Sequence, residues 1–168
     1  MGAGIMNKFG WFAWYEDLCL DLVGMYKINE NFKTGYDVVL TALEEADMEN
    51  STFPEIASNL HLLQFDQDNI ILSFMNKCSK LDELSLLYHK EELIKEYNLI
   101  KEAFVLKTIY EDLFYTWLKL SAMNLNNPYT YEGVKASKNR IIALQKPTFN
   151  RVIDQSMKIE SFRREKKF

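Results

Sequence analysis

The histidines are the residues best suited to catalysis or metal binding, and their spacing fits no established kind of site. A di-iron site in a helical bundle needs a Glu three residues before each His. Ser58 and Leu86 occupy those positions before His61 and His89. The chain also has no His-Glu-x-x-His or Cys-x-x-Cys motif, and it lacks the glycines of a P-loop, a dinucleotide fingerprint or a serine nucleophile elbow. We therefore predict a protein that is not an enzyme, with no catalytic residue, metal site or cofactor.

The two cysteines point to a reducing environment. Cys19 and Cys78 lie within apolar periodic segments, which is typical of buried free thiols rather than a disulfide framework. The sequence has no apolar run of about 18 residues and no recognisable signal peptide. We expect a cytoplasmic protein with no membrane partner.

Charge is divided very unevenly along the chain. Residues 126–168 contain ten Lys or Arg and four acids, a net +6, whereas residues 1–125 contain ten Lys and twenty acids, a net −10. Such an asymmetry of charge indicates what kind of partner the protein could bind, and it does not indicate the fold. The candidate contacts for nucleic acid or an acidic partner are Lys138, Arg140, Lys146, Arg151, Lys158, Arg163 and Arg164.

The acidic part offers a second candidate surface. Its residues could occupy the place of phosphates on a basic protein partner, and they are Asp37, Glu44, Glu45, Asp47 and Glu49. Glu91, Glu92 and Glu96 form another acidic cluster. Acidic clusters are also common on ordinary solvated helices, and that interpretation stays open.

The elements that must position these residues are predicted to be helices. The chain has only three Pro and six Gly, too few for many hairpins. We predict an all-α single domain of six to eight helices, made of an acidic body (1–125) and a basic two-helix C-terminal subregion (126–168) packed on or beside it. Apolar spacing places the helices at about 9–27, 34–49, 53–64, 68–79, 90–123, 130–145 and 148 onward, with a short helix before residue 90. Residues 69–74 also fit a buried strand.

The first predicted helix has an aromatic apolar face. Trp14, Tyr15, Leu18 and Leu22 recur at spacings of three and four residues. The simpler interpretation is that this face belongs to the core, and the alternative is an exposed docking face that supports a homodimer.

The long predicted helix at about 90–123 changes its apolar phase midway. Leu93, Tyr97, Ile100 and Phe104 lie on one face, and Leu106, Ile109, Tyr110, Leu113, Trp117 and Leu120 lie on nearly the opposite face. Heptad drift of about 20° is too small to explain this change. Either the helix breaks near Val105–Thr108, or one helix serves two packing surfaces in succession.

The basic C-terminal region begins at a predicted linker, 124–128. Its two predicted helices meet at Pro147. Their arrangement resembles a helix-turn-helix, with Thr148, Asn150 and Arg151 at the start of a recognition helix, although the usual turn glycine is missing. We expect a small regulator or inhibitor, of a kind found in mobile elements or viruses, that binds a protein partner through acidic and aromatic surfaces. Two alternatives are a nucleic-acid-binding accessory protein that uses the basic region, and a basic region that only docks on its own acidic body.

Overall fold

The fold is known from a computed structural model, which describes residues 12–45, 53–122 and 128–166. These ranges are almost entirely helical and contain α2 (Ala13–Glu45), α3 (Phe53–Ser79), α4 (Glu83–Tyr88), α5 (Lys90–Ala122) and α6 (Pro128–Glu165). The all-α prediction is confirmed, although the described residues form five helices rather than six to eight. Within these ranges, no helix combines the length and apolar character needed to cross a bilayer.

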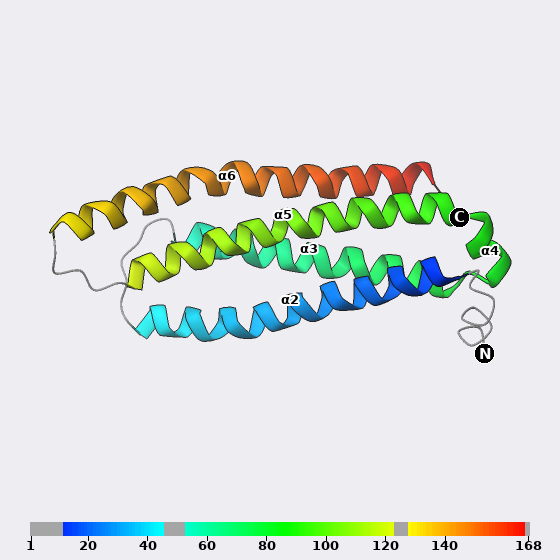
Figure 1. Ribbon diagram of the computed structural model, residues 1–168, viewed down its shortest axis with the longest axis horizontal. Coiled ribbons are helices and arrows are strands. Elements are labelled where there is room, and N and C mark those ends of the chain that lie inside the picture. The colour runs from blue at the N-terminus through cyan, green and yellow to red at the C-terminus, as the bar shows by residue number, and fades with distance from the viewer. Residues whose placement is uncertain (1–11, 46–52, 123–127, 167–168) are drawn as a thin grey trace.

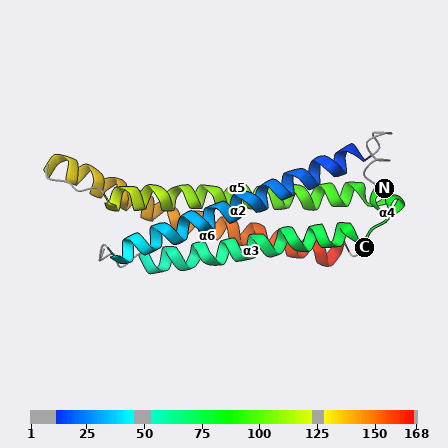
Figure 2. The same cartoon turned by 90° about the horizontal axis from the view of Figure 1, so that it is seen from below.

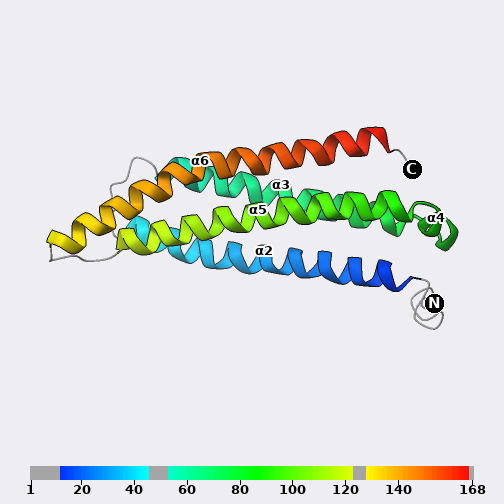
Figure 3. The ribbon, with the colours of Figure 1, turned by 45° about the horizontal axis from the view of Figure 1, so that its top comes forward.

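The four long helices form an elongated bundle in which each long helix runs opposite to the one before it (Figure 1). The short α4, which reverses the chain between α3 and α5, lies at one end (Figure 2). Asp82 caps α4, because its Oδ1 accepts a hydrogen bond from the Ser85 backbone N–H at 2.7 Å. α6 packs most extensively on α5, and it also contacts α3 (Figure 3).

The core side of α5 is one continuous stripe with spacings of three and four residues. Its fully or nearly fully buried members are Leu93, Glu96, Ile100, Ala103, Lys107, Tyr110, Phe114 and Trp117. This heptad-like spacing keeps one side of a helix against its neighbours in a bundle. The helix continues without a break through 105–108.

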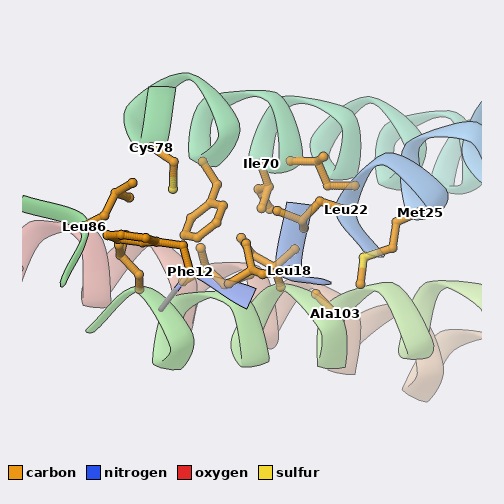
Figure 4. Close-up of a cluster of buried hydrophobic side chains, with 13 residues drawn as sticks. Phe12, Leu18, Leu22, Met25, Ile70, Cys78, Leu86 and Ala103 are labelled. Carbon is orange, nitrogen blue, oxygen red and sulfur yellow. The ribbon is translucent and has the colours of Figure 1, made fainter. Parts of the chain in front are cut away.

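Two apolar clusters fill the bundle, one toward each end. The first core cluster includes Leu22 of α2, Phe74 of α3, Leu93 of α5 and Ile159 of α6, and Figure 4 shows several of its members. The second core cluster includes Leu60, Leu63, Tyr110, Phe114, Trp117 and Val152. α5 therefore packs on two clusters in succession, as one of the two interpretations of its phase change proposed.

The phase change itself has a different origin from the one that the sequence suggested. Tyr97 and Phe104 flank the buried stripe on one side and pack on the first core cluster, whereas Leu106 and Leu113 flank the other side and pack on the second. Glu96 and Lys107 also belong to the buried stripe, which lies between these two flanks. Because both residues are charged, a search for apolar residues alone does not reveal the stripe. Ile109 is mostly outside the core, with 41% of its surface exposed.

The predicted boundary between helices at 28–33 is wrong, because α2 continues through it. Glu30 and Asn31 are exposed on the helix surface, whereas Asn29 faces the inside of the bundle. Asn29 is fully buried and its Nδ2 donates to Asp68 Oδ1 at 3.1 Å. The aromatic face of α2 is confirmed as core, since Leu18 and Leu22 are buried and Trp14 and Tyr15 pack on the first core cluster.

The predicted boundary at 65–67 and the alternative strand at 69–74 are also wrong, since both segments belong to α3. Asp68 lies at the predicted start of the helix at 68–79. Its carboxylate instead lies in the bundle as the partner of Asn29 and Lys33.

The basic region is one helix rather than two. α6 contains Pro147 in its interior, and the Thr148 hydroxyl donates to the Leu144 carbonyl at 2.8 Å instead of capping a new helix. Ile141, Val152 and Ile159 share one buried stripe across the proline, so packing maintains the helix where local sequence predicts its end. The helix-turn-helix interpretation is therefore wrong.

Candidate functional site

A buried ionic network lies where the two core clusters meet. Lys107 is fully buried, and its Nζ donates to Asn29 Oδ1 at 2.6 Å and pairs with the Glu111 carboxylate. Asn29 connects this pair to Asp68, which also pairs with Lys33. We call these five residues the Lys107 network; it joins α2, α3 and α5 through side chains.

Burial shifts the titration of both charged residues at the centre of this network. Desolvation lowers the pKa of Lys107 from its ordinary value, although Glu111 opposes the shift. Burial likewise raises the pKa of Glu111, against the attraction of Lys107. The Lys107 Nζ also lies 5.3 Å from the centre of the Phe104 ring and 5.8 Å from that of Phe32, which favours the cation.

A second buried carboxylate lies nearer the α4 end of the bundle. Glu96 is fully buried and pairs with Lys77 of α3 and with Arg163 of α6, whose Nε donates to Glu96 Oε1 at 2.7 Å. An Arg163 terminal nitrogen also donates to the Ile70 carbonyl at 3.0 Å. Glu96 therefore connects α5 to α3 and α6 through ion pairs inside the bundle. The prediction that it belongs to an acidic surface cluster is wrong.

The ionic partners of both buried groups are supplied by the protein itself, and Lys107, Glu111 and Glu96 do not line the four grooves identified among the described residues. The described residues contain no group of three or more His, Cys, Asp or Glu arranged to hold a metal ion. Buried ion pairs of this kind add little net stability compared with apolar residues of similar volume.

The apolar pattern of the sequence does not reveal the Lys107 network, because charged residues are expected to face solvent. One signal was available: positions 93, 96, 100, 103, 107, 110, 114 and 117 follow an unbroken three-four spacing. A heptad pattern with occasional polar members is a known feature of helical bundles.

The predicted basic contacts all lie on α6, and most face solvent. Arg140, Lys146, Arg151, Lys158 and Arg164 are exposed, and none forms an ion pair with a described residue. We call these five residues the α6 basic face. Lys138 is half-buried, and Arg163 is occupied by Glu96.

The α6 basic face has two rows, because α-helical residues advance by about 100°. Arg140, Arg151 and Lys158 share one row, on the side of α6 that borders α5. Lys146 and Arg164 share the other row, about 120–140° around the helix.

The row nearer α5 borders a groove of about 770 Å³ between α5 and α6. Lys101, Val105 and Leu106 of α5 line it, together with Arg151, Gln155 and Lys158 of α6. Glu102 and Asp154 add two carboxylates. The Gln155 Nε2 donates to Glu102 Oε2 at 2.9 Å and to the Leu99 carbonyl at 3.2 Å, which fixes this wall.

The structure describes little of the predicted acidic surface. Asp37 is exposed on α2. Glu44 and Glu45 lie in the last turn of α2, where side chains are outside the described part, and Asp47 and Glu49 lie outside the described residues altogether. The structure therefore does not bring these five residues together as one surface.

Comparison with protein-family models, with curated proteins and with solved structures finds no match to this chain. The function is therefore inferred from the residues of this chain and their arrangement alone.

Proposed function

We propose that this protein is a non-enzymatic binding protein whose α6 basic face contacts a nucleic acid. The observation that carries the proposal is the direction in which the basic charges point. Residues 126–168 have a net charge of +6 and residues 1–125 a net charge of −10. If these charges served only to dock α6 on the body, most cations of α6 would be expected to form ion pairs with acids of the body.

The packing of α6 argues against such internal neutralisation. The helix contacts the bundle through neutral residues: Ile141, Gln145, Thr148, Val152, Gln155 and Ile159. Among the described residues, the one ion pair that joins α6 to the body is Arg163–Glu96. The cations of the α6 basic face are thus left for an external anion.

The dimensions of the α6 basic face also suit a polyanion. From Arg140 to Lys158, the row of cations nearer α5 spans about 27 Å along the helix, at about 1.5 Å per residue. A row of separated cations of this length fits a chain of phosphates better than a single small anion, and its contacts would release counterions.

A protein partner was the function that the sequence favoured, through the acidic and aromatic residues. That proposal has less support, because the aromatic face of α2 is used in the core and most of the acidic residues lie outside the described side chains. We therefore place nucleic acid first.

The test compares exposed charges of equal number on and off α6. The five residues of the α6 basic face are changed together to Gln, and the control changes five exposed lysines elsewhere: Lys27, Lys80, Lys90, Lys95 and Lys119. Binding of fluorescent DNA and RNA oligonucleotides is measured by anisotropy from about 50 to 200 mM salt. Point variants are preferable to removal of 126–168, because Ile141, Val152 and Ile159 belong to the core.

We expect the wild type and the lysine control to bind with a steep salt dependence. The α6 variant should lose most of its affinity, and the slope of log affinity against log salt should fall by about 0.7–0.9 for each contact removed. Equal losses in both variants would show that the charge effect is general. Absence of wild-type binding at ~50 mM salt would overturn the proposal.

A further inference from the structure

The groove between α5 and α6 combines two features that a phosphate-binding surface alone does not need. Its lining includes cations and a small apolar patch, which we call the floor. The floor is formed by Leu106, which is half-buried, and by Val105, of which 48% is exposed. An exposed apolar floor flanked by cations fits a ligand that has an anionic part and an apolar part.

The cations come from both walls of the groove. Arg151 and Lys158 lie two turns apart on α6, about 10 Å along its axis, and neither has an ion-pair partner among the described residues. Cations spaced in this way along one side of a helix can contact neighbouring phosphates of one nucleic-acid chain. Lys101 faces them from α5, although it also lies 3.4 Å from Asp21.

The two carboxylates determine where the parts of the ligand would lie. Glu102 and Asp154 repel phosphates, and their oxygens accept hydrogen bonds from amino groups such as those on bases. Phosphates are therefore expected on Arg151 and Lys158, and a base is expected over Val105 and Leu106.

A base can reach this floor only when it has left its stack. A duplex keeps its bases paired and presents phosphates, whereas a single strand can splay its bases onto a protein surface. The floor is aliphatic rather than aromatic, so base contact would come from apolar burial and the phosphates would supply most of the affinity.

We infer that the α5–α6 groove holds a nucleotide of a single-stranded nucleic acid, with its flanking phosphates on Arg151 and Lys158 and its base on Val105 and Leu106. This inference rests on the proposed function and deepens it, since it names the form of nucleic acid and the part of the α6 basic face that contacts it.

The two rows of α6 provide a matched test. The groove variant carries Arg151→Glu and Lys158→Glu, and the control variant carries Lys146→Glu and Arg164→Glu. All four residues are exposed on one helix, and both variants make the same change in net charge. Circular dichroism and thermal unfolding verify that each variant is folded. Affinity is measured by anisotropy with fluorescent oligo(dC) and oligo(C) of 15 nucleotides, whose bases carry amino groups, and with a duplex of equal length, at about 50 mM salt.

We expect the groove variant to bind single strands about tenfold more weakly or worse, with a salt slope smaller by about 1.4 for two lost contacts. The control variant should lose less single-strand affinity than the groove variant, and it should weaken single strands and duplex by a similar factor, because Lys146 and Arg164 lie outside the groove. A third variant, Val105→Ser, removes apolar surface without charge, and it should weaken single-strand binding while leaving the duplex affinity unchanged.

Two results would overturn the inference while leaving the proposed function intact. One is a control variant that loses as much affinity as the groove variant. The other is a wild-type protein that binds the duplex at least as tightly as the single strands. If wild type binds none of the three oligonucleotides, the proposed function fails as well.

Discussion

The Lys107–Glu111 pair allows a quantitative test of the buried network. Changing Lys107 to Met leaves the Glu111 carboxylate, which is 6% exposed, without its cation. Changing Glu111 to Leu leaves the fully buried Lys107 ammonium with Asn29 as its nearest polar partner. The double variant replaces both charges by apolar groups of similar size.

Each single change should reduce the free energy of unfolding by about 3–5 kcal/mol, the usual cost of removing one partner from a buried ion pair. The double variant should lie within about 1–2 kcal/mol of the wild type, because desolvation of both charges offsets most of their attraction. The single variants therefore should not add, and the coupling free energy should exceed about 3 kcal/mol.

Urea unfolding followed by circular dichroism at pH 7 measures these differences. With a slope near 2 kcal/mol per molar urea, each single variant should lower the midpoint by about 1.5–2.5 M. Single costs below about 1 kcal/mol, with additivity in the double variant, would refute a dry, paired network.

The same pair has a pH dependence whose sign follows from Glu111. Burial raises the pKa of Glu111 above its ordinary 4.5, so the folded state binds its proton more readily than the unfolded state. This group therefore costs stability as pH rises through its folded pKa. Without the cation the cost grows, so the stability gap between wild type and Lys107→Met should narrow as pH falls toward 4.5. A constant gap would contradict the assignment.

Three further predictions concern the fold. Pro147 is exposed inside α6, so Pro147→Ala should raise the free energy of unfolding by about 1–3 kcal/mol in a urea titration by restoring a helical hydrogen bond; a loss of stability would contradict a continuous helix. Cys78 is buried, and burial raises its pKa to about 12, so its reaction with a disulfide reagent at pH 8 should be far slower in folded than in urea-unfolded protein, with Cys78→Ser as the control. Leu93→Ala should cost about 2–5 kcal/mol because Leu93 is fully buried, and Leu113→Ala should cost less because Leu113 is half-buried; equal costs would argue against a fully buried stripe with a less buried flank on α5.

Several features were available from the sequence because they depend on local chemistry. Scarcity of Pro and Gly and the three-four apolar spacing predict helices, and the described residues form helices and no strands. The aromatic face of α2 was correctly assigned to the core, because apolar side chains such as Leu18 and Leu22 recur on one side of the helix and are stabilised by burial. The asymmetry of charge is likewise a property of composition.

The tertiary structure decided where helices end and which polar residues are inside. Asn29, Asp68 and Thr148 have the chemistry of loops and caps. Asn29 and Asp68 lie in helix interiors because each has a partner on another helix, and the Thr148 hydroxyl donates to the Leu144 carbonyl of its own helix. Pro147 is tolerated because buried residues on both sides of it share one stripe. Glu96 is buried because Lys77 and Arg163 meet it from distant parts of the chain, and Lys107 is buried between Glu111 of its own helix and Asn29 of α2. An apolar pattern records neither arrangement. The sequence by itself determined a helical protein with a basic C-terminal region, and the packing determined that α6 turns neutral residues inward and most of its cations outward.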